Sequence, residues 1–152
     1  MSASELPVSC SITYRPDLHL LIGRWPGDAP VPQLQADFEA VLQKAEQHGV
    51  TRWLLDVRRR DQLNPELAQW TNYTFYPLAS ARLAPSPLRV AVLCSPARLA
   101  IYDSDAQQRE YLTYGLAAER PYQLRLFGTR ARLCSGCSTS PGPRLPIVGP
   151  PI

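Results

Sequence analysis

The chain has 152 residues, of which 45% are hydrophobic and 19% are charged, and its formal net charge is +3. This length fits one domain with a substantial core, and no run approaches the roughly 18 consecutive apolar residues that span a membrane. Only residues 58–60 form a run of basic side chains, which is too little for the basic stripe of a nucleic-acid-binding protein. The N-terminus lacks the basic and apolar regions of a signal peptide, so we expect a cytoplasmic protein.

The first predicted elements are a β-hairpin and a helix. Residues 11–14 and 18–22 are rich in β-forming side chains, and residues 15–17 between them have turn chemistry. Residues 32–48 show the spacing of one apolar helical face, formed by Leu34, Phe38, Val41, Leu42 and Ala45. A proline at the start of this segment and Gly49 just after it are typical helix ends.

A buried strand and a second helix follow. Residues 53–57 form a short apolar run, as expected for a strand that is buried on both faces. Asn64, Pro65 and Glu66 then supply a capping side chain, a proline for the first helical position and an acid near the positive end of the helix dipole. We predict that this second helix ends or bends at Pro77.

The predicted fold class is α/β. Residues 88–93 form another buried strand, residues 106–116 a third helix and residues 123–127 a last strand. The resulting order β-β-α-β-α-β-α-β implies right-handed crossovers and a mostly parallel sheet of four to five strands with covering helices. We predict that this domain occupies residues 8–127.

The central strand and the second helix resemble a known superfamily. Residues 51–60 read Thr-Arg-Trp-Leu-Leu-Asp-Val-Arg-Arg-Arg, and residues 64–70 read Asn-Pro-Glu-Leu-Ala-Gln-Trp. Together with the hairpin that leads to Trp25 and the proline in the second helix, they are similar to a group of uncharacterised bacterial proteins in the STAS-like superfamily. That superfamily contains the anti-sigma-factor antagonists and resembles the CRAL-TRIO lipid-binding fold. The resemblance covers roughly residues 12–127 and implies a STAS-like arrangement.

One departure from the superfamily bears on mechanism. In the anti-sigma-factor antagonists, the loop after the central strand carries a Ser or Thr two residues after an Asp, and a kinase phosphorylates it. Here the residue two positions beyond Asp56 is Arg58. Because arginine cannot accept that phosphate, we do not expect partner switching by phosphorylation.

The loop from Asp56 to Asn64 is the first candidate site. It follows the carboxyl end of a buried strand and precedes a helix, which is where open α/β sheets usually bind ligands. The free amides of that helix, together with Arg58, Arg59 and Arg60, would attract a phosphate or a carboxylate. The alternative is structural: Asp56 pairs with one arginine to order the loop, and the other arginines are solvated.

Aromatic residues concentrate around the second helix, and they are Trp53, Trp70, Tyr73, Phe75 and Tyr76. They line either a pocket or interface or an ordinary core. On a helix, Tyr73, Phe75 and Tyr76 point in different directions, so we expect some aromatic surface, whose natural use is contact with a partner or a second copy. We therefore count Trp70, Tyr73 and Tyr76 as binding candidates.

The sequence carries no catalytic or metal-binding motif. It has no Gly-rich phosphate loop, nucleophile elbow or His-Glu metal helix, and neither His19 nor His48 has companion ligands at metal-binding spacing. We predict no catalytic residues, no metal and no cofactor, and we expect that the protein is not an enzyme.

From Gly128 onward the sequence changes in character. Cys134 and Cys137 resemble half of a zinc or redox site, but a single pair without companions is a weak signal. Residues 138–152 are rich in Pro, Gly and Ser. We predict that residues 128–152 form an irregular, disordered tail.

The proteins that the chain resembles end instead with an amphipathic helix. GC-rich codons can be chosen for residues 132–139 so that reading from the third base of the first codon gives Ala-Leu-Gln-Trp-Leu-Leu-Asn, which fits that helix. We therefore hypothesise that the tail is the out-of-frame product of a frameshift or sequencing error near residues 128–132. Sequencing the gene across this stretch tests the hypothesis, because codons incompatible with the alternative frame would exclude it.

These observations favour binding over chemistry. We expect a non-catalytic STAS-like module that acts in regulation by contact with another protein or with a second copy, through the loop of residues 56–64 and the aromatic second helix. The alternative is a small-molecule or lipid-binding domain, by analogy with the CRAL-TRIO fold, in which an arginine in an apolar cleft anchors an anionic ligand. We expect no nucleic acid and no membrane span.

Overall fold

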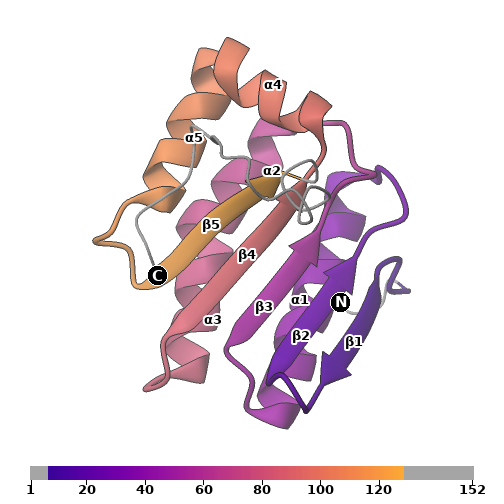
Figure 1. Cartoon of the computed structure of the whole chain (residues 1–152), viewed down its shortest axis with the longest axis vertical. Coiled ribbons are helices and arrows are strands. Elements are labelled where there is room, and N and C mark those ends of the chain that lie inside the picture. Colours follow the sequence, from indigo (N-terminus) through magenta and orange to yellow (C-terminus); the bar gives the residue numbers. More distant parts are fainter. Residues whose placement is uncertain (1–6, 129–152) are drawn as a thin grey trace, which may run out of the picture.

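The structure is a computed structural model of the chain and describes residues 7–128. Five strands form one sheet in chain order, and they are β1 (Ser11–Arg15), β2 (Leu20–Arg24), β3 (Arg52–Asp56), β4 (Leu88–Cys94) and β5 (Tyr122–Gly128). β1 and β2 are antiparallel, whereas every later neighbour is parallel (Figure 1). The predicted α/β class with a mostly parallel sheet is confirmed. The predictions on residues 129–152, including Cys134, Cys137 and the alternative frame, lie outside the described residues.

The helices connect the parallel strands and lie on one face of the sheet. They are α1 (Val31–His48), α2 (Pro65–Trp70), the π-helix η2 (Thr71–Phe75), α3 (Tyr76–Leu83), α4 (Pro96–Ser104) and α5 (Ala106–Leu116). Because each crossover is right-handed and each moves to the next strand in the same direction, all of them return over the same face. Figure 1 shows α1, α2 and α3 together behind the sheet. None of the helices in residues 7–128 has the length and apolar character needed to cross a bilayer.

The core lies between the sheet and these helices. Leu21, Trp53, Val90 and Leu124 are register partners across four adjacent strands, and all are buried. The next residue along each strand points to the opposite face. That face has no helix over it among the described residues, and it carries several arginines, including Arg52 and Arg89, which are exposed.

The predicted ends of α1 and the predicted start of α2 are confirmed. Gly49 adopts a left-handed conformation with φ of 63°, which ends α1 after His48. At α2, the Asn64 side chain accepts a hydrogen bond of 3.1 Å from the Glu66 amide, and Pro65 occupies the first helical turn. The Asn64 cap fixes where the loop after β3 ends and α2 begins.

Of the two alternatives predicted at Pro77, an end or a bend of the second helix, the end is wrong, because the helical segment continues to Leu83. A proline ring inside a helix clashes with the carbonyl four residues earlier, which here belongs to Tyr73. The chain widens into the π-helical turn just before this point, where the Tyr76 amide donates to the Thr71 carbonyl five residues back. The wider turn makes room for the proline, and π-turns of this kind often lie beside functional sites.

The close packing of α5 on the sheet gives a testable expectation. A side chain at Gly115 would begin 3.0 Å from Leu124 and 3.1 Å from the Asn72 amide oxygen, and the Asn72 amide group is itself tied to the Tyr111 carbonyl. We expect Gly115→Val to lower the free energy of unfolding by about 1–3 kcal/mol through overpacking, measured by urea denaturation. Gly27→Val is the control, because nothing lies within 4 Å of the added atom there. Equal stability of both variants would contradict this packing.

Candidate functional site

The loop after β3 divides its three arginines between different environments. Arg58 binds Asp56 through two side-chain hydrogen bonds of 2.9 and 2.7 Å, and its amide donates to the same carboxylate at 3.1 Å. Arg24 lies 3.5 Å from this carboxylate. Arg59 is exposed. The pair of Asp56 and Arg58 corresponds to the structural alternative of the sequence analysis, in which Asp56 pairs with one arginine and orders the loop.

The charge of Asp56 is well compensated. Burial by itself would raise the pKa of Asp56, but the hydrogen bonds from the Arg58 side chain and amide, with the charges of Arg58 and Arg24, bring the pKa below its ordinary value. The carboxylate therefore stays ionised at neutral pH and occupies Arg58. These two residues are consequently less available to a ligand than the sequence alone indicates.

Arg60, in contrast, turns to the helix-covered side of the sheet. A tight turn, closed by a 3.0 Å hydrogen bond from the Arg60 amide to the Val57 carbonyl, reverses the chain. The Arg60 side chain is only 2% exposed, and its guanidinium carbon lies 5.9 Å from the centre of the Trp25 ring. A charged side chain is thus placed inside the apolar layer.

A second buried arginine joins Arg60 from a distant part of the chain. Arg98 lies in the first turn of α4, which Ser95 caps through a 3.1 Å hydrogen bond from the Arg98 amide. Its side chain is 7% exposed, and its Nη1 donates to the Arg60 carbonyl at 3.1 Å. Burial raises the pKa of both Tyr102 and Cys94, and the nearby charge of Arg98 partly offsets this rise. The fold thereby brings two guanidinium groups to one place.

Neither arginine has an anionic partner within the described part of the chain. No carboxylate of residues 7–128 forms an ion pair with Arg60 or Arg98, and the Nε atom of each is buried without a hydrogen-bond partner. Burial, reinforced by the like charge of Arg98, lowers the pKa of Arg60 to about 10, although Asp28 partly offsets this. Buried charge without compensation is unfavourable, so this arrangement calls for a functional reason.

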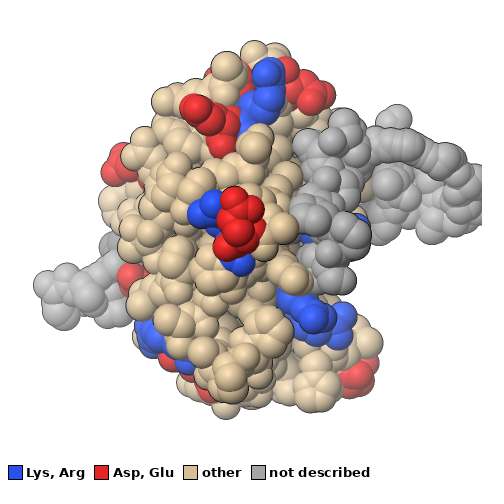
Figure 2. Space-filling view, turned by 90° about the vertical axis from the view of Figure 1, so that its left-hand side faces the viewer, with Lys and Arg blue, Asp and Glu red and all other residues tan. Residues whose placement is uncertain are grey.

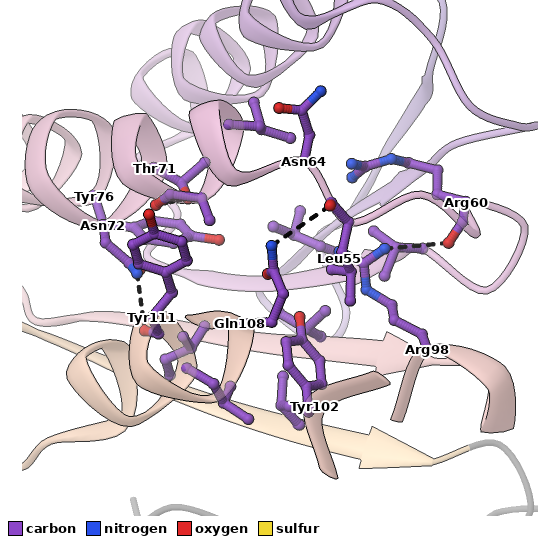
Figure 3. Close-up of a pocket in the computed structure, with 18 of the residues that line it drawn as sticks. Leu55, Arg60, Asn64, Thr71, Asn72, Tyr76, Arg98, Tyr102, Gln108 and Tyr111 are labelled. Carbon is purple, nitrogen blue, oxygen red and sulfur yellow. Dashed lines mark hydrogen bonds between the residues drawn. The ribbon is translucent and has the colours of Figure 1, made fainter. Parts of the chain in front are cut away.

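The two arginines lie beside a cavity of about 90 Å³ between the sheet and the helices. Its floor is formed by apolar residues near the carboxyl ends of β3, β4 and β5, and they include Leu55, Val92 and Leu126. Figure 3 shows polar side chains that converge on this space from opposite sides: Thr71 and Asn72 from η2, and Tyr102 and Gln108 from α4 and α5. Ligands in open α/β folds bind at this end of the strands.

The groups around the cavity are suited to holding an anion. Burial raises the pKa of both Tyr76 and Tyr102, so both hydroxyls stay protonated at neutral pH and can donate hydrogen bonds. Among the described residues, no His, Cys, Asp or Glu lines the cavity. A general base and a carboxylate nucleophile are therefore absent from its described lining.

The remaining predicted site residues lie around the second helix. Asn64 caps α2 and also lines the cavity. Tyr76 is buried and Trp70 is half-buried, with its ring stacked on Phe75 at 5.1 Å. Tyr73 is 51% exposed and packs edge-on against Tyr114 at 4.5 Å. Of the three aromatic candidates, only Tyr73 presents most of its ring to solvent.

A second, more open hollow lies at the ends of β2 and β3, has a volume of about 480 Å³ and is lined by Arg24, Asp56, Arg58 and Arg59 among others. Asp56 pairs with Arg58 and lies near Arg24, whereas Arg59 has no such partner among the described residues, so the lining keeps an excess of positive charge. Figure 2 views the molecule from the side of β5 and α5 and shows basic residues in small groups, most of them beside acidic ones. Exposed arginines such as Arg52 and Arg59 also form no ion pair with the described residues. Arg60 and Arg98 differ from them in being buried without a counterion.

Comparisons of this chain with protein-family models, with curated proteins and with solved structures give no match. No three His, Cys, Asp or Glu side chains within residues 7–128 are grouped as a metal site would require.

Sequence reasoning missed Arg98, Tyr102 and Gln108, which come from α4 and α5. The signal for α4 was present, since Ser95-Pro96 is the same cap-and-proline pair that predicts α2 at Asn64-Pro65.

Proposed function

We propose that this protein is a non-catalytic binding module for a small anionic molecule, which the buried pair of Arg60 and Arg98 holds. The observation that carries the proposal is that both guanidinium groups are buried, lack a carboxylate partner among the described residues and keep an unbonded Nε. An anion in the adjoining cavity would compensate both charges and accept these hydrogen bonds.

A STAS-like relationship is part of the proposal. The hairpin followed by parallel strands in chain order supports it, as does the position of the cavity at the carboxyl ends of those strands. Fold analogy alone does not assign function, so the ligand is argued from the arginines. The absence of an acid or a base from the described lining supports binding without catalysis.

The test is thermal unfolding of the full chain with sodium acetate, butyrate, phosphate or sulfate, each against chloride at equal ionic strength. We expect at least one of these anions to raise the melting temperature of the wild type, because ligand at a hundredfold excess over its Kd stabilises the folded state by about 2.7 kcal/mol. Arg98→Met should abolish the increase. Arg59→Met is the matched control and should preserve it, since Arg59 is exposed in the same loop.

Two results would contradict the proposal. One is that none of the four anions stabilises the wild type more than chloride does. The other is that the Arg98→Met variant responds as the wild type does, which would place the anion elsewhere on the molecule.

A second candidate function is contact with a protein partner, which the exposed apolar residues of the second helical segment favour. Tyr73 is 51% exposed and Leu78 is 47% exposed. Because Tyr76 is buried, such a contact would use Tyr73 and its neighbour Tyr114 rather than the whole aromatic set. Loss of a dimer or of a captured partner in Tyr73→Ala, with folding unchanged, would support this candidate.

A further inference from the structure

The cavity beside Arg60 and Arg98 has an apolar floor, whereas the arginines at its side are charged. The floor consists of aliphatic side chains from three parallel strands, Leu55, Val92 and Leu126, which are register partners. The arginines lie on the side of the cavity nearest the loop after β3 (Figure 3). A ligand that satisfies both parts must have a charged end and an apolar end.

We propose that the ligand is a short aliphatic monocarboxylate of about four to seven carbons, with its carboxylate at Arg60 and Arg98 and its chain over the floor. This inference rests on the proposed function and narrows it. Three features of the cavity decide the chemical class of the ligand, and they are its hydrogen-bond donors, its size and its apolar floor.

The available donors match a carboxylate. Each arginine leaves one buried Nε–H without a partner, and a carboxylate has two oxygens to accept from two such donors. Phosphate has more oxygens to satisfy and more charge to bury. On this side, the Gln108 amide is already directed at the Leu63 carbonyl, with a hydrogen bond of 3.4 Å.

The size of the cavity sets the chain length. A single water needs roughly 10–15 Å³ of such space, so a cavity of about 90 Å³ has room for about six to nine non-hydrogen atoms. A monocarboxylate contains two more non-hydrogen atoms than it has carbons, which gives the range of about four to seven carbons. A phospholipid or a long-chain fatty acid is several times too large for this space.

The deciding measurement is isothermal titration calorimetry of the full chain with sodium acetate, butyrate, hexanoate and decanoate, with phosphate and hexanol as comparison ligands. We expect affinity to rise about fourfold for each added methylene from acetate to hexanoate and to fall again at decanoate, which exceeds the cavity. Hexanol, which lacks the charge, should bind at least tenfold more weakly than hexanoate.

A cavity-filling variant checks the location. Ala68 lines the cavity from α2, so we expect Ala68→Leu to weaken hexanoate binding at least tenfold and acetate binding less than threefold. Ala100→Leu is the matched control, because Ala100 is exposed on α4, and should leave the series unchanged. If Ala68→Leu does not fold, the chain-length series on the wild type still decides the question.

The outcomes separate the two proposals. Two results would overturn the monocarboxylate and leave anion binding standing, provided that binding depends on Arg98. One is that phosphate binds more tightly than hexanoate, and the other is that hexanoate binds no more tightly than acetate. No Arg98-dependent binding of any anion would overturn both.

Discussion

Replacing Arg60 with methionine should raise the free energy of unfolding of the ligand-free protein by about 1–4 kcal/mol. The Arg60 guanidinium is 2% exposed, and it lies beside a second cation. Methionine keeps much of the side-chain length and removes the buried charge. The folded protein gives up stability to keep this charge in place, as functional sites often do.

The direction of the pKa shift of Arg60 determines how its effect on stability depends on pH. Burial lowers the pKa of Arg60 to about 10, below its ordinary value, so the folded state binds this proton more weakly than the unfolded state does. The destabilisation is therefore fully present below pH 10 and is relieved as the pH rises toward the ordinary arginine value. At neutral pH, the shift corresponds to roughly 3 kcal/mol, which falls within the range expected for the substitution.

Urea denaturation at pH 7 without added carboxylate or phosphate measures this effect. Arg59→Met is the control and should change the free energy of unfolding by less than about 0.5 kcal/mol, since surface substitutions are usually of that size. A large loss of stability in Arg60→Met would mean that the arginine already has a compensating partner in the free protein. Arg60→Met should also lose the stabilisation by anions, so that the variant gains stability and loses binding.

Replacing Phe75 with alanine should lower the free energy of unfolding by about 3–5 kcal/mol. The Phe75 ring is 1% exposed and contacts four other aromatic rings, which belong to Phe38, Trp53, Trp70 and Tyr76. Its removal opens a cavity at the centre of the layer between α1 and the sheet. The π-helical turn that carries Phe75 also carries Thr71 and Asn72 of the ligand cavity, so we expect ligand binding to weaken as well.

Tyr73→Ala is the matched control, because Tyr73 lies two residues away in the same turn but is 51% exposed. It should cost less than about 1 kcal/mol, which is the size expected from one exposed aromatic pair with Tyr114. Urea denaturation followed by tryptophan fluorescence measures both variants. If Phe75→Ala were as stable as Tyr73→Ala, the aromatic set would not be a core and the partner-contact hypothesis would gain support.

Local signals in the sequence predicted most of the fold. The periodic apolar face, with a proline in its first turn and a glycine after it, placed α1 within one residue of its observed start. The second helix was placed correctly at its start, whereas the end that was one of two alternatives at Pro77 was wrong. A single residue such as Pro77 cannot reveal that a π-turn accommodates it, because that turn depends on packing against α5 and the sheet.

The candidate site was predicted less completely, for a reason that lies in backbone geometry. Three consecutive arginines look alike in a sequence, and the alternation of a strand would place Arg58 and Arg60 on the same side. The turn closed between Val57 and Arg60 breaks that alternation. Arg98 lies 38 residues further along the chain, and no local pattern links it to Arg60.

The order of the strands has a consequence for how this protein is made. Because each strand pairs with the one synthesised just before it, the sheet can grow in the same direction as the chain leaves the ribosome. The arginine from the loop after β3 is in place early, but its companion and the last wall of the cavity arrive only with α4, α5 and β5. The proposed binding site is thus the final part to form, and we expect local opening of this edge unit to release a ligand without unfolding the rest.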